Sequence, residues 1–361
     1  MPDAPESEEM FAYLRETFGR QLREAEPLSR HGTFGVGGPA DAWVNITSEA
    51  ALERLATQAW ERGWPLMLIG NGTNVLYSDA GARGIVARMA LMDWTLEPLD
   101  EGDVRLRVGA GVSLPRLVND LAAQGVSGLE WAAGVPGTVG GAVVSNAGVN
   151  ASVVAGALKS TPESVAGGKG ASNACVADAL ESARVLFTPD AHEGEPGRVV
   201  IRELPASALD LTYRHSRFRA ARRVGFDDDG HPQAAPRALI EPPEMITGAT
   251  FILQRDEPEA IQRRVTYYKQ HRKDTQPPQQ SAGSVFKNPQ GDHSGRLIQS
   301  VGLKGTRIGG AEISQKHANF IVNTGGARAA DVVALIALAR RTVRERCGVE
   351  LELEVELRGD W

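Results

Sequence analysis

The chain contains 361 residues, of which 42% are apolar and 23% are charged, and its formal net charge is −6. This length and composition predict a globular protein of two or three domains with a large core. The acidic balance, without a stripe of clustered lysine and arginine, argues against a nucleic-acid-binding surface. The two cysteines, Cys175 and Cys347, are far apart and lack metal-ligand spacing, so we expect neither a disulfide framework nor a metal site.

The first residues lack the apolar core of a secretory signal, and no apolar run reaches the length of a membrane span. We therefore expect a cytoplasmic protein without membrane or nucleic-acid partners. We also expect a monomer, although this does not follow from the sequence pattern. The chain also has 40 glycines. Such an excess is typical of proteins with many short strands or with a ligand that meets the backbone closely.

Apolar residues at helical spacing predict a first helix over residues 10–22, which leads into strands. A second helix is capped by Thr47 or Ser48. The short apolar strand 65–69 follows, and it ends in the turn "GNGTN", residues 70–74.

Short runs at 84–88 and 104–108 predict two further strands, and another helix begins at Ser113. Helices and strands thus mix in an α+β pattern. Two stretches lack periodicity: we interpret 154–177 as an exposed insertion and 226–244 as a loop.

A strand over 247–254 precedes a further helix, and we place a domain boundary between them, near Arg255. The chain ends in "LELEVELRG", whose alternation predicts a strand. Its apolar residues face one way, and Glu352, Glu354 and Glu356 face the other.

The stretch "AAGVPGTVGGAVVSNAG", residues 132–148, contains five glycines and no charged residue. Bare backbone N–H groups suit a diphosphate held by main-chain dipoles. The stretch matches neither the Rossmann nor the P-loop fingerprint, and by itself it also fits a pair of glycine-rich turns in a sheet. The second uncharged turn, residues 70–74, favours phosphate binding, because a sheet does not require two such turns.

Six stretches in succession resemble the signatures of the MurB family, the UDP-N-acetylenolpyruvoylglucosamine reductases of cell-wall synthesis. The resemblance extends from about Pro27 to Gly359. The six stretches are "GNGTNVLYSDAGARGIV", "GLEWAAGVPGTVGGAVVSNAG", "YRHSRF", "SAGSVFKNP", "GRLIQSVGLKGTRIGGAEISQKHANFIVN" and "LELEV".

The resemblance implies an α+β fold with two parts: a two-subdomain FAD-binding fold of the vanillyl-alcohol-oxidase type, and a C-terminal α+β substrate-binding domain. We assign residues 1–254 to the FAD-binding domain, divided near 95–100, and residues 255–349 to the substrate-binding domain. The last strand, 350–361, is a candidate to return to the FAD-binding domain.

The resemblance also implies a reaction. NADPH reduces bound FAD, and FAD reduces UDP-N-acetylglucosamine enolpyruvate to UDP-N-acetylmuramate, a step in peptidoglycan precursor synthesis. Hydride adds to the terminal vinyl carbon, negative charge collects on the carboxylate side, and a proton must reach the adjacent carbon. The site therefore needs a cation and one proton donor.

Three residues match the family's catalytic positions. Arg214 in "YRHSRF" matches the arginine, whose guanidinium suits a carboxylate that becomes an enolate. Ser284 in "GSVF" matches the proton donor, although by composition alone it is a turn residue. Glu354 matches the family's glutamate only by alignment, and Glu356 stands where the family usually has a basic residue.

The same match assigns residues to the ligands. Tyr213, Lys287 and Asn288 are the expected substrate contacts. His317 in "KHANF" is either a ligand contact or a histidine with a structural hydrogen bond. The residues expected to bind FAD, with threonine at position 73 in place of the usual serine, are Gly70, Asn71, Gly72, Thr73, Asn74, Gly134, Pro136, Gly137, Thr138, Val139, Gly140, Gly141, Asn146 and Gly148.

Two other functions fit part of the sequence. A flavin oxidase of the same superfold, using molecular oxygen, would explain the glycine turns but not "GSVFKNP" or "KHANF". A nucleotide-binding or flavin-storage module would need no aligned Arg214, Ser284 and Glu354. We therefore expect the flavin-dependent reductase.

Overall fold

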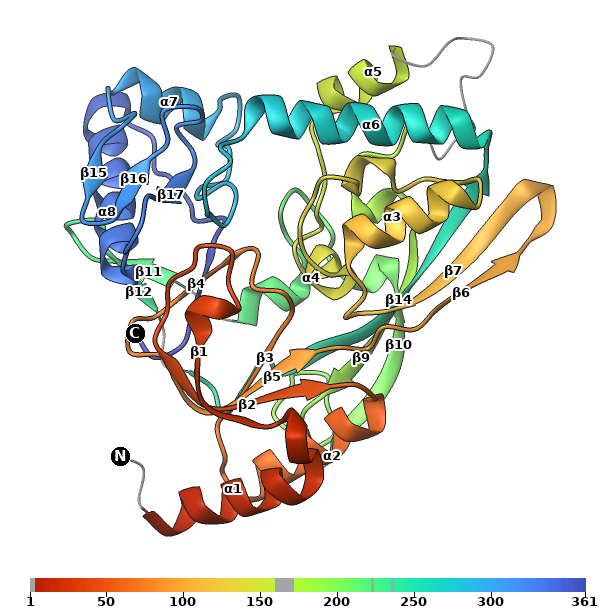
Figure 1. Ribbon diagram of the computed structural model, residues 1–361, viewed down its shortest axis with the longest axis vertical. Helices are drawn as coiled ribbons and strands as arrows, with labels where there is room; N and C mark the ends of the chain where they lie inside the picture. The colour runs from red at the N-terminus through yellow and green to blue at the C-terminus, as the bar shows by residue number, and fades with distance from the viewer. Residues whose placement is uncertain (1–3, 160–171, 222–223, 235–236) are drawn as a thin grey trace.

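The computed structural model describes residues 4–159, 172–221, 224–234 and 237–361. Two large sheets and one small sheet, each with its own helices, make three units (Figure 1). None of the helices in these ranges is both long and apolar enough to cross a membrane.

The first unit is a five-stranded mixed sheet with helices α1 (Ala4–Phe18) and α2 (Glu49–Glu61) on one face. Ser48 caps α2, because its side chain accepts a hydrogen bond from the Ala51 N–H. The central strand β5 is buried along most of its length, as is typical of a parallel strand that is covered on both faces. In spatial order, the strands are β1 (Arg23–Pro27), β2 (Pro39–Ile46), β5 (Ala82–Met89), β3 (Leu66–Ile69) and β13 (Ile240–Glu241).

The second unit is an antiparallel sheet against which α3 (Leu114–Ala123) and α4 (Val139–Val144) pack. We define the second glycine turn as residues 136–141; helix α4 begins within it, at Val139. In spatial order, the strands are β10 (Val200–Pro205), β9 (Leu180–Phe187), β14 (Glu244–Arg255), β7 (Asp103–Gly109) and β6 (Trp94–Pro98), with β8 (Val126–Ser127) beside the end of β14.

Helix α6 (Pro258–Thr275) crosses over the second unit and ends beside the third (Figure 1). Its buried residues Ile261, Val265 and Tyr268 belong to the core that the first two units share. Our predicted boundary near Arg255 would separate this helix from its own core. Because few packed contacts cross a domain boundary, we propose that the boundary lies at the end of α6 instead.

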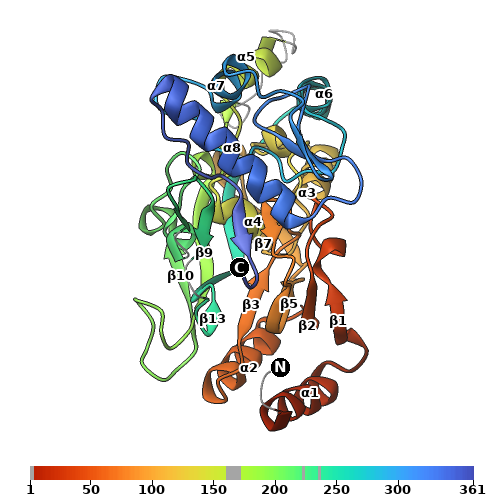
Figure 2. The same ribbon diagram turned by 90° about the vertical axis from the view of Figure 1, so that its left-hand side faces the viewer.

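The third unit packs α7 (Ser294–Ser300) and α8 (Ala329–Cys347) on a small sheet around a separate core. Figure 2 shows α8 lying across the front of this unit. Helix α8 ends at Cys347, and its C-cap residue Gly348 has a left-handed φ of 69°. The strands are β15 (Arg307–Ile308), β16 (Ala311–Ile313) and β17 (Ile321–Asn323).

The C-terminal segment returns to the first unit. Strand β18 (Glu356–Arg358) pairs in parallel with β4 (Val75–Tyr77), which directly follows the first glycine turn, residues 70–74. The observed strand is therefore shorter than the alternating sequence 351–359 that predicted it. Upstream of β18, Leu353 forms only an isolated antiparallel bridge, with Phe286.

The two stretches without periodicity contain short elements. Helix α5 (Ala151–Lys159) covers the start of the predicted insertion, and residues 160–171 lie outside the described ranges. In the predicted loop 226–244, β11 (Val224–Phe226) pairs with β12 (Pro232–Ala234), and β13 extends the first sheet. Strands of two or three residues are too short for an alternating pattern to reveal.

Candidate active site

The two glycine turns approach each other between the first and second units. A Cβ atom on Gly70 would lie 2.9 Å from Thr138 Oγ1, and one on Gly137 would lie 2.9 Å from Thr73 Oγ1. Glycine at these two positions therefore lets the turns meet without side chains between them. This contact brings together the two stretches that the sequence singled out for phosphate binding.

A cavity of about 270 Å³ lies along both turns. Hydrophobic residues of the first two units, such as Ile69 and Ile246, form part of its wall. Most of the residues expected to bind FAD line it. These are Gly70, Asn71, Gly72, Thr73, Asn74, Pro136, Gly137, Thr138, Gly140, Gly141 and Gly148.

The other three expected FAD residues have different surroundings. Val139 is buried in the core. The Asn146 amide donates to Thr212 O at 2.9 Å and accepts from the Ala177 N–H at 3.0 Å, so it joins segments of the second unit. Gly134 lies under a side chain of α6, because a Cβ there would come within 2.5 Å of Arg272 Cδ.

The first glycine turn has the backbone groups that a diphosphate needs. Within the described residues, no hydrogen-bond partner is found for the N–H groups of Asn71, Gly72 and Thr73. In the second turn, by contrast, the N–H groups of Val139 and Gly140 donate to carbonyls of residues 112 and 110. The second turn therefore offers fewer free donors than its composition suggests, because two of its N–H groups are bonded to the segment 110–112.

The proposed catalytic residues Arg214, Ser284 and Glu354 come together from three segments. Arg214 Nε lies 2.9 Å from Glu354 Oε1, close enough for an ion pair but off hydrogen-bond alignment. Arg214 Nη2 also donates to Gly148 O at 3.0 Å. The ion pair thus joins the second unit to the C-terminal segment.

Backbone pairing places Ser284 near Glu354. The Glu354 N–H donates to Val285 O at 2.8 Å, and the Lys287 N–H donates to Glu352 O at 2.9 Å. These bonds hold the segment after Ser284 antiparallel to the segment before β18.

The three glutamates of the C-terminal segment differ in environment. The Glu352 side chain is 76% exposed, whereas that of Glu354 is only 14% exposed. Burial raises the pKa of Glu354, although Arg214 and nearby cations act in the opposite direction. Glu356 forms an ion pair with Arg358 at 2.6 Å, and this neighbour holds the pKa of Glu356 below its usual value despite burial.

A second cavity, of about 640 Å³, lies between α6 and the third unit. Tyr213, Asn288 and His317 line it. Asn288 also accepts a hydrogen bond from the Ser294 N–H at 3.1 Å, at the start of α7. Lys287 is not among the lining residues described, and its Nζ lies 3.6 Å from the exposed carboxylate of Glu352.

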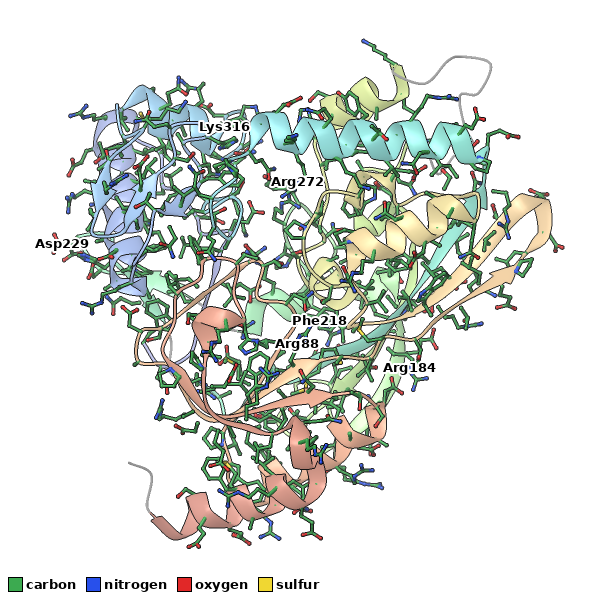
Figure 3. The ribbon with its side chains drawn as sticks, viewed as in Figure 1. Arg88, Arg184, Phe218, Asp229, Arg272 and Lys316 are labelled. Carbon is green, nitrogen blue, oxygen red and sulfur yellow. The ribbon has the colours of Figure 1, made fainter. Side chains whose placement is uncertain are left out.

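The sequence reasoning missed Arg272, which lines both cavities. Arg272 is near the end of α6, and Figure 3 shows that its side chain points from the helix toward the centre of the molecule. Burial and the nearby charge of Arg214 lower the pKa of Arg272 to about 10. Within the described residues, no carboxylate pairs with this guanidinium. In the sequence, Arg272 looks like an ordinary cation in the last turn of a helix. Nothing in the local pattern indicates that it lines a cavity.

Both cavities meet at the proposed catalytic residues. The residues that line the two cavities in common are Gly148, Arg214, Arg272, Gln276, Ser284, Phe320 and Glu354. A molecule in one cavity can therefore meet a molecule in the other beside Arg214, Ser284 and Glu354. That arrangement suits transfer between a bound cofactor and a substrate.

Comparison with known proteins gives two family matches. A family described as UDP-N-acetylenolpyruvoylglucosamine reductase, C-terminal domain, matches residues 275–358, and an FAD binding domain family matches residues 40–167. The first match begins at the end of α6.

Curated relatives match over nearly their whole length. UDP-N-acetylenolpyruvoylglucosamine reductase of Chloroflexus aggregans is 38% identical over 95% of this chain and 100% of its own. The enzyme of the same name from Moorella thermoacetica is 37% identical over 94% of each chain. A crystal structure of the reductase (MurB) from Thermus caldophilus has 34% identity and a TM-score of 0.64, and covers 92% of this chain and 97% of that one. These matches confirm the resemblance and the fold expected from the sequence motifs.

Proposed function

Because the chain belongs to the UDP-N-acetylenolpyruvoylglucosamine reductase (MurB) family, we propose that its two cavities hold FAD and, in turn, NADPH and the UDP-sugar substrate. The protein is an FAD-dependent oxidoreductase of peptidoglycan precursor synthesis. It reduces UDP-N-acetylglucosamine enolpyruvate to UDP-N-acetylmuramate with NADPH. The observation that carries the assignment of the site is that Arg214, Ser284 and Glu354 line both cavities where they meet.

The cavity along the glycine turns would hold FAD. Free N–H groups of Asn71, Gly72 and Thr73 support this, because they can donate to a diphosphate without any lysine. Arg88 Nη2 donates to Asn71 Oδ1 at 2.9 Å and orients the turn. When bound, FAD supplies hydride transfer between NADPH and the vinyl carbon of the substrate.

Arg214 would stabilise the charge that develops on the substrate carboxylate, because a guanidinium can pair with both oxygens. Glu354 holds this guanidinium through their ion pair at 2.9 Å. Ser284 would donate the proton: its O–H bond breaks as the new C–H bond forms at the carbon adjacent to the hydride acceptor. Arg214 and Arg272 offset the negative charge left near the serine oxygen.

The second cavity would bind the UDP part of the substrate. Its cations suit a diphosphate, since Arg272, Lys304 and Lys316 all line it. Tyr213 and Asn288 line the same cavity and remain proposed contacts. We propose that Lys287 acts at longer range, because its charge faces Glu354 and lowers the pKa of that carboxyl. We further propose that the protein works as a monomer in the cytoplasm, where its nucleotide substrates are found.

An anaerobic spectral titration tests this function. NADPH should bleach the flavin absorbance of the purified protein, and the enolpyruvyl substrate should restore it. In Ser284→Ala, we expect bleaching at nearly the normal rate but restoration slowed by about 100- to 10,000-fold, because only the second half-reaction uses the proton donor. Equal slowing of both halves would show that Ser284 is structural, and failure of wild-type restoration would disprove the substrate assignment.

A further inference from the structure

Arg219 connects the backbones of two proposed catalytic residues. It lies in a short 3-10 helix, Arg217–Ala221, directly after Phe218, which lies near the centre of the molecule (Figure 3). Its Nη1 donates to the backbone carbonyl of Arg214 at 3.2 Å, and its Nη2 donates to the backbone carbonyl of Glu354. One guanidinium thus holds two carbonyls that are 140 positions apart in the chain.

The first of these carbonyls belongs to a residue with an unfavourable backbone. Arg214 has a φ of 52°, in the left-handed region that side chains with a Cβ atom rarely occupy. It lies in a tight turn in which Thr212 and His215 exchange two backbone hydrogen bonds. Such a conformation persists where surrounding contacts hold it, and the bond from Arg219 is one of them.

The second carbonyl is shared with the first glycine turn. Asn74 Nδ2 donates to Glu354 O at 2.9 Å, and the Glu356 N–H donates to Asn74 O at 2.9 Å. The backbone of Glu354 is therefore held from the FAD side by Asn74 and from the Arg214 side by Arg219.

We infer that Arg219 is a positioning residue for the reduction of the substrate: it fixes the Arg214 and Glu354 backbones so that their side chains meet beside Ser284. The ion pair between the two side chains does not by itself fix the distance between their backbones. A guanidinium fork bonded to both carbonyls fixes that distance, and an ammonium group cannot reproduce its planar geometry. This inference rests on the proposed function.

Arg219 also contributes charge. The cations that lower the pKa of Glu354 against the effect of burial are Arg214 on its turn, Arg219 on its 3-10 helix and Lys287 on the segment after Ser284. Loss of the Arg219 charge should raise the pKa of Glu354 further. A general loss of stability in the variant would not by itself produce this shift.

The test compares Arg219→Met and Arg219→Lys with wild-type holoenzyme by anaerobic stopped flow. In Arg219→Met, we expect flavin reduction by NADPH within about twofold of wild type and reoxidation by the enolpyruvyl substrate slowed by about 10- to 100-fold. Arg219→Lys should show a smaller loss in reoxidation. The pH profile of the reoxidation rate should have a limb that is absent in Glu354→Gln. This limb should move to higher pH in Arg219→Met and stay in place in Arg219→Lys.

Arg202→Met is the matched control. Arg202 is an exposed arginine that likewise donates to a backbone carbonyl, that of Glu193, and it should leave both half-reactions unchanged. Should Arg219→Met fail to fold, Arg219→Lys carries the test, and wild-type reoxidation in Arg219→Lys would then overturn the inference. Equal slowing of both halves, or an unmoved pH limb in Arg219→Met, would also overturn it. Wild-type holoenzyme separates the two proposals, because its failure to be reoxidised by the enolpyruvyl substrate would instead disprove the proposed function.

Discussion

Burial distinguishes three glutamates that the sequence presents as equivalent. Glu352, Glu354 and Glu356 alternate with apolar residues, yet only Glu354 is both mostly buried and paired with Arg214. Glu356 is instead paired with Arg358, so this chain keeps a basic partner two residues after the position where the family usually has one. The arginine at 358 offsets the charge that Glu356 adds to the cavity wall.

Glu354→Gln should lower kcat for enolpyruvyl reduction by at least about 100-fold, because it removes the carboxylate that holds Arg214. Glu352→Gln should remain close to wild type, since its side chain is 76% exposed. Steady-state kinetics of the two variants check this. A larger loss at Glu352 would show that alignment and burial have both selected the wrong residue.

The same two variants should also differ in how their thermal stability depends on pH. Because burial raises the pKa of Glu354, the folded protein binds this proton more tightly than the unfolded chain does. The stability from this group is therefore present at low pH and lost as the pH rises through the folded pKa. The Tm of Glu354→Gln minus that of wild type should thus increase from pH 4 to pH 8, while the same difference for Glu352→Gln stays flat.

Among the elements, the short helix α4 and its glycines shape the wall of the first cavity. Gly140 packs on Ala110, where a Cβ would lie 2.8 Å from the Ala110 Cβ. Gly141 differs, because its nearest neighbour would be Thr138 Oγ1 at 3.5 Å, an ordinary contact. Gly140 is therefore needed for packing, whereas Gly141 keeps the cavity wall free of a side chain.

Gly141→Ala should weaken FAD binding by about tenfold, since the added methyl group enters the space that we assign to the cofactor. The apoprotein should keep its Tm, because the protein itself accommodates this methyl group. Fluorescence titration of apoprotein with FAD measures the affinity. As a control, Gly63→Ala should bind FAD normally but lose about 1 kcal/mol of stability, because φ is 68° there. Normal FAD affinity in Gly141→Ala would contradict the assignment of the cavity.

At the scale of the whole molecule, α6 connects the units. The Arg264 side chain is fully buried and pairs with Glu130 at 2.9 Å and with Asp256. At its other end, α6 brings Arg272 to the cavities, and Lys316 of the third unit donates to Lys273 O at 2.7 Å. A single helix therefore links the core of the first two units to the second cavity.

Arg264→Ala should destabilise the protein by about 3–5 kcal/mol, because it leaves two buried carboxylates without their cation. Arg263→Ala is the matched control: Arg263 is 38% exposed and its ion pair with Glu259 at 3.8 Å is on the surface, so we expect a change within about 0.5 kcal/mol. Urea unfolding of both variants gives the comparison. Similar stability in the two would mean that the buried cluster does not hold α6 in place.

The family, the cofactor and several of the longer helices could be predicted from the sequence alone. Glycine turns, helix caps and apolar periodicity depend on residues that are close in the sequence, so they can be recognised without a structure. The two glycine turns were both recognised in this way. The order of the family motifs then assigned Arg214, Ser284 and Glu354.

How these parts meet depends on tertiary packing. The sequence did not predict that Asn74 and Arg219 hold the Glu354 carbonyl, that Arg272 lines both cavities, or that α6 belongs to the core of the first two units. Each of these contacts joins residues far apart in the chain. Such contacts depend on how the units pack, and a buried ionisable residue and an exposed one have the same local sequence pattern until that packing is known.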